Sequence, residues 1–223
     1  MRSVIAAAWL LSLLALNGPW LQAAETDPFP LSMSRSNEAW RGDFDGMLER
    51  RMIRVLVPYS RTLFFNDKGQ ERGVTAEIAR EFETWLNRKL APRLGRRPLT
   101  VYLIPTTRDR LLPALEEGLG DIAAGNLAVT PARLARADFV IQPDRGAVRE
   151  LIATGPGAPP LESLEDLSGK TVHVRAATSY AESLAALNVR FASAGLAPVT
   201  IVELPAAIED EDKLEMLNAG LLQ

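Results

Sequence analysis

Between residues 53 and 124 the chain alternates short continuous apolar runs with stretches in which apolar residues recur at helical spacing. The runs at 53–57, 101–104 and 121–124 predict strands that are buried on both faces of a sheet. Helices are predicted over 74–90 and 108–117. The apolar stripe of the first helix consists of Val74, Ile78, Phe82, Trp85 and Leu86. This alternation predicts a parallel sheet with helices on both faces.

A second unit with the same alternation begins near Leu151. The stiff segment Gly155–Pro160 leads into it. Its predicted elements are a short helical piece over 161–167, a strand over 171–175, a helix that starts with a capping box at 179–182, a strand over 199–204 and an acidic helix over 211–218. The fold class is therefore α/β with two lobes, and ligands of open α/β sheets bind at the carboxyl ends of the strands.

The N-terminal segment has the pattern of a targeting sequence. Arg2 supplies a positive charge, Val4–Leu16 is almost wholly apolar, and Ala23-Ala24 offers small residues for cleavage. Because the apolar run is too short to span a bilayer, we expect residues 1–24 to be a cleaved signal peptide and the mature protein to be exported. Residues 25–44 are interpreted as a leader linker, since they are rich in Ser, Pro and Asn.

Composition narrows the chemistry that the chain can perform. The formal net charge is −3 and the basic residues are scattered, which argues against a nucleic-acid surface. The chain has no cysteine, so a disulfide framework, a thiolate metal site and lipoprotein attachment are excluded. The single histidine, His173, lies in a predicted strand, where a half-exposed position is favoured over a ligand or a catalytic base. Neither a metal site nor a cofactor is predicted.

The stretch GDIAAGNLAVTPAR at 120–133 carries the clearest functional pattern. A short strand opens into a loop of small residues, and Thr130-Pro131 then predicts a helix start, because threonine caps free amides and proline suits the first helical position. Arg133 lies in the first turn, where a two-pronged donor beside a positive helix end suits a carboxylate. On this motif alone, an arginine on a solvated helix face is an equal alternative.

This motif, followed by Asp138-Phe139, resembles the family 3 extracellular solute-binding proteins. Three further blocks are similar to the sensor half of membrane-bound lytic murein transglycosylase F: GDFDGMLERR with IRVLVPYSRTLFFNDKGQERG (42–51 and 53–73), SLEDLSGKTVHVR (163–175) and EDEDKLEMLNAG (209–220). The resemblance covers residues 42–220. It implies a type II periplasmic-binding-protein-like fold, with lobe 1 at 45–145, a hinge or connector at 146–160 and part of lobe 2 at 161–223. It also implies a periplasmic location, with the periphery of the outer membrane as an alternative.

The resemblance assigns candidate ligand-binding residues in both lobes. In lobe 1, Arg133 matches the arginine that grips a ligand carboxylate, Thr130 matches the neighbouring hydroxyl, and the loop from Asn126 to Ala128 matches the backbone that lines the cleft. In lobe 2, Thr178 and Ser179 match a helix N-terminus that helps to hold the same anion, and free amides there suit that role. Plain helix capping is the alternative for these two residues.

An aromatic wall against the ligand is the third feature that the resemblance implies. Tyr59, Phe64 and Phe65 fall where the family often places it. Ordinary packing of a hairpin is an equal alternative for them. Because neighbouring side chains of an extended chain point in opposite directions, at most one of the two phenylalanines should face the cleft.

The sequence departs from the family towards its C-terminal end. The acidic residue late in lobe 2 that pairs with a ligand amine in amino-acid-binding relatives has no counterpart up to Gln223, and neither have the strands that return to lobe 1. We therefore expect a C-terminally truncated second lobe with an unpaired sheet edge. A module that another chain completes is the alternative.

Catalysis by this chain alone is not expected. In the transglycosylase relatives, peptidoglycan cleavage belongs to a separate lysozyme-like domain whose essential glutamate typically precedes a serine. Glu162-Ser163 and Glu182-Ser183 are such dipeptides, but each is explained by a local helix start. A glutamate acid also requires a raised pKa in an apolar groove, which neither sequence context provides. No catalytic residue is assigned.

Two functions follow from these patterns. The favoured one is an exported solute-binding or sensor module for a small carboxylate-bearing ligand, an amino acid or a cell-wall peptide, whose lobes close on binding. Its partners would be that ligand and a transporter or a peptidoglycan-cleaving domain, without nucleic acid. The alternative is a fragment of a lytic murein transglycosylase that lacks its C-terminal catalytic domain. A non-binding structural remnant is a third possibility.

Overall fold

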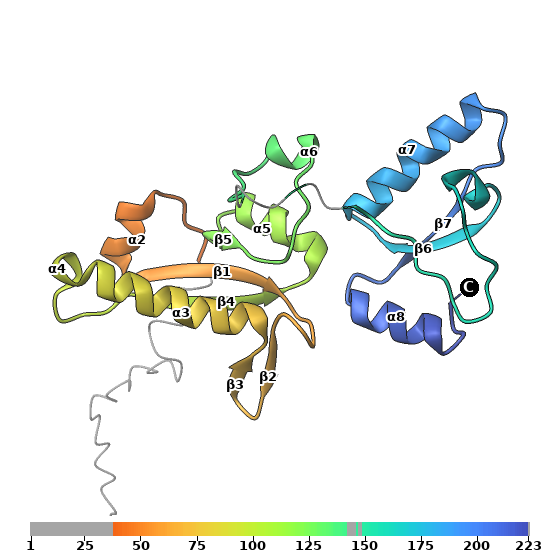
Figure 1. Ribbon diagram of the computed structural model, residues 1–223. Coiled ribbons are helices and arrows are strands. Elements are labelled where there is room, and N and C mark those ends of the chain that lie inside the picture. Colours follow the sequence, from red (N-terminus) through yellow and green to blue (C-terminus); the bar gives the residue numbers. More distant parts are fainter. Residues whose placement is uncertain (1–37, 142–145, 147–148, 223) are drawn as a thin grey trace, which may run out of the picture.

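The computed structural model describes residues 38–141, 146 and 149–222, which form two α/β lobes (Figure 1). The predicted signal peptide and most of the predicted leader linker lie outside these residues. None of the helices within the described residues is long and apolar enough to cross a membrane.

Lobe 1 is built around a parallel sheet of three strands in the order β4-β1-β5. The strands are β1 (Met52–Pro58), β4 (Thr100–Thr106) and β5 (Ile122–Ala123). All seven residues of the central strand β1 are buried, as its apolar run predicts. The three predicted strands and their parallel pairing are confirmed.

Helices cover both faces of this sheet. The alternating residues Ile53, Val55 and Val57 of β1 share a core cluster with buried residues of α3 (Val74–Lys89). On the other face, Leu56 packs with Leu111 and Ala114 of α5 (Leu111–Glu116), which follows the short 3-10 helix η1 (Arg108–Arg110). The β1 strand therefore lies between two helical layers.

Smaller elements complete lobe 1. They are α2 (Phe44–Arg50), the hairpin strands β2 (Phe65–Asp67) and β3 (Gln70–Arg72), α4 (Ala91–Leu94) and α6 (Pro131–Leu134). The hairpin turns at Lys68 and Gly69, which both have positive φ, as a two-residue hairpin turn requires.

The apolar stripe predicted for α3 is correct only in part. Leu86 is buried, but Val74, Ile78 and Trp85 are between 49 and 60% exposed. The side of α3 that faces the sheet is instead formed by Ala76 and Ala79 together with Leu86. Small side chains there let the helix lie close to β1, and the larger apolar residues flank the contact.

Lobe 2 repeats the α/β pattern on a smaller scale. It contains η2 (Leu164–Leu167), β6 (Thr171–Arg175), α7 (Ser179–Ser193), β7 (Thr200–Leu204) and α8 (Asp210–Asn218). The strands β6 and β7 pair in parallel and form a two-stranded sheet. Phe191 of α7 lies at 2% exposure in the core that covers this sheet.

The start of α7 differs from the prediction by one residue. The N-cap is Thr178, whose hydroxyl accepts the amide of Ala181 at 3.3 Å. Ser179 is the first helical residue, so the predicted capping box between Ser179 and Glu182 is wrong. Either hydroxyl can cap a helix, and here Thr178 has the extended backbone that the cap position requires.

A buried ion pair and its hydrogen bonds link the first described residues to the lobe 1 sheet. Arg54 of β1 is fully buried and pairs with Asp121 at 2.8 Å. Its Nη1 donates to the carbonyl oxygen of Glu38 at 2.7 Å, and Nη2, which pairs with Asp121, also donates to that of Trp40 at 3.2 Å. Residues 38–40, which the sequence places in a linker, are therefore bound to the lobe 1 sheet.

Candidate functional site

The two lobes meet at the carboxyl edge of the lobe 1 sheet. Loops that follow β1, β4 and β5 carry Ser60, Arg108 and the segment up to Arg133. Each contacts lobe 2: Ser60 bonds to Glu211, Arg108 to Glu209, and Arg133 to Ala177. We call this region the lobe junction: the loops after these three strands together with the N-termini of α7 and α8. It is the place where an open α/β sheet binds ligands.

Arg133 connects the two lobes within the junction. Thr130 caps α6 by accepting the amide of Arg133 at 3.4 Å, which confirms the predicted helix start. The guanidinium is buried and donates to the carbonyl oxygen of Ala128 in lobe 1 and to that of Ala177 in lobe 2, both at 3.1 Å. Its ion-pair partner, Glu182 of α7, lies 3.6 Å away. A solvated helix face, the alternative for Arg133, is excluded by this burial.

The N-terminus of α7 lies beside Arg133. Thr178 and Ser179 are both buried there. The Thr178 hydroxyl donates to the carbonyl oxygen of Arg175 at 2.8 Å in addition to capping the helix. The capping alternative therefore describes the present contacts of Thr178, and ligand contact by these two residues stays a prediction.

The loop from Asn126 to Ala128 is shaped by its backbone. Asn126 adopts a positive φ of 51°, a conformation that asparagine tolerates better than most residues. On either side of it, the carbonyl oxygens of Gly125 and Ala128 accept hydrogen bonds from Arg108 and Arg133. The backbone of this loop thus lines the junction between the guanidinium groups of Arg108 and Arg133.

The three aromatic candidates do not form one wall. Phe64 is 3% exposed and belongs to the core of lobe 1, so packing accounts for it. Tyr59 is 59% exposed and meets the Phe64 ring edge-on, with centroids 6.4 Å apart. Phe65 lies in β2 and lines a surface groove between the hairpin and the first half of α3. Of the three, Tyr59 follows β1 directly and is the one with an accessible ring near the junction.

The buried charged cluster of Glu209, Arg108 and Arg175 was not predicted from the sequence. The carboxylate of Glu209 is buried between two guanidinium groups, that of Arg108 at 2.7 Å and that of Arg175. Arg175 also pairs with Asp210 at 3.1 Å. Two of the three could have been found, because Arg108 follows the predicted strand at 101–104 and Glu209 precedes an acidic helix.

The two Glu-Ser dipeptides lie on the surface. Glu162 is exposed, and the side chain of Glu182 is 46% exposed beside Arg133. Ser163 is the N-cap of η2. Exposed carboxylates of this kind lack the apolar surroundings that raise the pKa of a catalytic acid.

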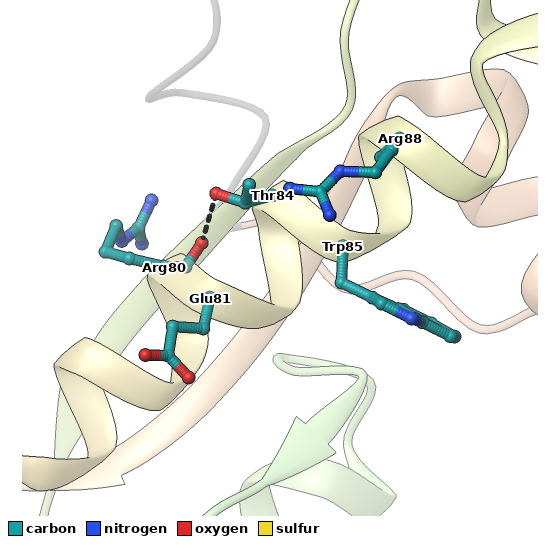
Figure 2. A pocket seen from close by; sticks show the side chains of 5 residues that line it. All are labelled: Arg80, Glu81, Thr84, Trp85 and Arg88. Atoms are coloured by element: carbon teal, nitrogen blue, oxygen red, sulfur yellow. Dashed lines mark hydrogen bonds between the residues drawn. The ribbon is translucent and has the colours of Figure 1, made fainter.

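A groove of about 440 Å³ lies on lobe 1, along the exposed side of α3 (Figure 2). Its lining residues are Arg80, Glu81, Thr84, Trp85 and Arg88. All five come from consecutive turns of one helix, and the Trp85 ring points away from the helix axis beside them. This is the open side of a helix and not an enclosed site, since binding pockets generally bury most of their ligand.

Comparisons with known proteins agree with this architecture. No family model matches the sequence. A curated relative, the membrane-bound lytic murein transglycosylase F of Ectopseudomonas mendocina, is 28% identical over 169 residues, which cover 75% of this chain and 31% of the relative. The chain thus spans about a third of the length of the curated relative that it matches.

Solved structures resemble this fold over 77 to 80% of the chain. An ancestral amino acid-binding protein, a precursor of cyclohexadienyl dehydratase, is 25% identical with a TM-score of 0.52 over 80% of this chain and 71% of that protein. A structure from the glutathione import system of Streptococcus mutans has a TM-score of 0.54 at 12% identity, over 77% and 65%. A solute receptor for L-cysteine of Neisseria gonorrhoeae has a TM-score of 0.50 at 16% identity, over 79% and 64%. The chain has the α/β fold of type II periplasmic binding proteins and resembles the family 3 solute-binding proteins.

Proposed function

We propose that this chain is an exported binding or sensor module that holds a small carboxylate-bearing ligand, an amino acid or a cell-wall peptide, at the lobe junction. The ligand carboxylate would be held by Arg133, with the Thr130 hydroxyl and the helix N-terminus at Thr178 and Ser179 beside it and Tyr59 against the ligand's side chain. Catalysis is not part of this role. The binding-protein fold and the amino acid-binding relative at 25% identity support the proposal.

The observation that carries the proposal is the environment of Arg133. Its guanidinium is buried at the junction, and its hydrogen bonds go to two uncharged carbonyl oxygens, one in each lobe. The carboxylate that it meets, Glu182, is half exposed and 3.6 Å away. A buried cation gains most from a close carboxylate partner, so a ligand carboxylate at this position would be bound strongly.

A thermal-shift screen of amino acids and muropeptides tests the proposal. A ligand present at a hundred times its dissociation constant stabilises the folded state by about 2.7 kcal/mol, which is a readily measured shift. In Arg133→Ala the shift should disappear, because a charge-assisted pair of this kind contributes roughly 2–5 kcal/mol to binding.

Arg136→Ala is the matched control. Arg136 lies three residues further along, and its exposed side chain pairs with Glu116 at 2.6 Å. We expect it to keep the ligand response of the unsubstituted chain. Since Arg133 is buried, its variant must also melt cooperatively without ligand. A folded Arg133→Ala protein with unchanged affinity would show that the carboxylate binds elsewhere.

A second candidate function is the same binding role within a longer murein-cleaving protein. The observation in its favour is the similarity to the transglycosylase relative, in which the matched segment makes up 31% of the length. Muropeptides and not free amino acids should then give the larger thermal shift. A response confined to free amino acids would favour the first candidate.

A further inference from the structure

Arg108 forms a first anion-accepting position at the carboxyl edge of the lobe 1 sheet. It lies in η1, directly after β4, and its side chain is 12% exposed. One guanidinium nitrogen is held by the carbonyl oxygen of Gly125, so Nε and Nη2 face lobe 2. Both donate to Oε2 of Glu209, at 3.3 and 2.7 Å. A guanidinium that is fixed on one side presents a preorganised carboxylate site on the other.

Ser60 forms a second anion-accepting position, in the loop after β1. Its hydroxyl oxygen accepts the amides of Thr62 and Leu63, at 3.2 and 3.1 Å. Its proton is then directed at Oε1 of Glu211, 2.6 Å away. Burial acts to raise the pKa of Glu211, but the hydrogen bonds from Ser60 and from backbone amides of this loop outweigh it, and the pKa lies below its usual value. The loop therefore favours the charged carboxylate.

Both carboxylates come from the beginning of one helix. Glu209 is the N-cap of α8, and Glu211 lies in its first turn. Asp212 of the same turn adds an exposed pair with Arg61 at 2.9 Å. Across the junction, lobe 1 thus supplies Arg108, Arg61 and Ser60, and α8 supplies the anions; within lobe 2, Glu209 also pairs with Arg175. This is the charge arrangement expected between a binding site and an anionic ligand.

We propose that α8 is an internal occupant of the lobe junction, and that the external ligand replaces the carboxylates of Glu209 and Glu211 with two carboxylates of its own. The inference rests on the proposed function for the place of binding, the lobe junction, and adds two carboxylate positions there, at Arg108 and Ser60, besides the one at Arg133; the ligand class for these two positions is a small dicarboxylate. It also adds a form of regulation, because α8 and the ligand compete for Arg108 and Ser60.

Competition makes a specific prediction for Glu211→Gln. The apparent affinity of a ligand falls in proportion to the fraction of the protein whose site is free. Glutamine weakens the internal contact with Ser60, so more of the protein is free to bind. We expect dicarboxylates to bind about tenfold more tightly to this variant, the usual effect of one hydrogen bond to a charged group.

The experiment measures binding of succinate, glutarate and adipate to the full chain by calorimetry. Butyrate, with one carboxylate, is the comparison probe. Glu203→Gln is the matched control variant, because Glu203 is an exposed glutamate of β7 and its substitution makes the same change in charge. At least one dicarboxylate should bind about tenfold more tightly to Glu211→Gln than to Glu203→Gln, with butyrate unchanged. Adding Ser60→Ala to Glu211→Gln should remove this gain.

Other results overturn the inference. Equal affinities of the two glutamine variants would show that α8 does not compete, and an equal gain for butyrate would show that the second carboxylate plays no part. If amino acids bind in an Arg133-dependent way while no dicarboxylate prefers Glu211→Gln, this inference fails and the proposed function stands. If cooperatively folded proteins bind none of the amino acids, muropeptides or dicarboxylates, both fail.

Discussion

The buried pair of Arg54 and Asp121 makes a quantitative prediction about how lobe 1 is held together. The two side chains are 0 and 2% exposed, and the nitrogen and oxygen atoms lie 2.8 Å apart. Asp121→Ala removes the carboxylate and leaves the guanidinium buried with only the carbonyl oxygens of Glu38 and Trp40. Stranding one member of a buried ion pair typically costs about 3–5 kcal/mol of unfolding free energy.

This loss is large compared with the total stability of a domain, which is about 5–15 kcal/mol. For a domain of roughly 100 residues, each kcal/mol corresponds to about 4–8 °C in the melting temperature. We therefore expect Asp121→Ala to melt at least about 10 °C below the unsubstituted chain. A cost of this size follows from desolvation, because water cannot replace the missing carboxylate.

Urea unfolding followed by tryptophan fluorescence measures the effect, since Trp40 is bound directly to Arg54 through its carbonyl oxygen. Glu116→Gln, which breaks the exposed pair with Arg136, is the control and should leave the midpoint unchanged. The double variant Arg54→Met with Asp121→Ala should recover part of the loss, because no charge is stranded. Equal midpoints for Asp121→Ala and Glu116→Gln would refute the reasoning.

Two further predictions concern packing and pH. Gly120→Ala places a Cβ 2.4 Å from Cγ of Leu56, so we expect it to lose about 1–3 kcal/mol of unfolding free energy, measured in urea. Gly155→Ala is the control, because its Cβ meets nothing closer than 3.5 Å and its unfolding free energy should change little. Equal losses in the two variants would contradict this account. Because the pKa of Glu211 is lowered in the folded state, its stabilising contribution is complete above the ordinary value of 4.5 and is lost as the pH falls through the folded pKa. The stability difference between the unsubstituted chain and Glu211→Gln should thus shrink below pH 4.5, and a constant difference down to pH 3 would exclude this role for Glu211.

Local sequence patterns predicted most of the elements of both lobes. The apolar run at β1 indicated a strand between two layers, and Thr130-Pro131 indicated the start of α6. These features depend on neighbouring residues, so spacing and capping chemistry reveal them. Which side of α3 faces the sheet was harder to predict. Hydrophobicity alone favours the larger Val74 and Ile78, but these are exposed and the small Ala76 and Ala79 are buried against the sheet.

Long-range pairs explain what the sequence could not show. Arg54 was visible only as one arginine in an apolar strand, since its partner Asp121 lies 67 residues away. The Arg108–Glu209 pair spans 101 residues and joins two lobes. Arg133 was found because a local motif contains it, but its bond to Ala177 depends on how lobe 2 is placed. Periodicity carries no information on such pairings.

The small size of lobe 2 links its stability to the lobe junction. Its sheet has two parallel strands, β6 and β7, and parallel pairs of strands are stable only when other elements cover them. The first turn of α8 is held from both lobes: Glu209 meets Arg108 and Glu211 meets Ser60 across the junction, and Arg175 of lobe 2 pairs with Glu209. The same contacts therefore hold lobe 2 in place and fill the edge at which a ligand would bind. A ligand that displaces α8 must offset the contacts that it breaks, so its measured affinity reports the difference between two sets of carboxylate contacts.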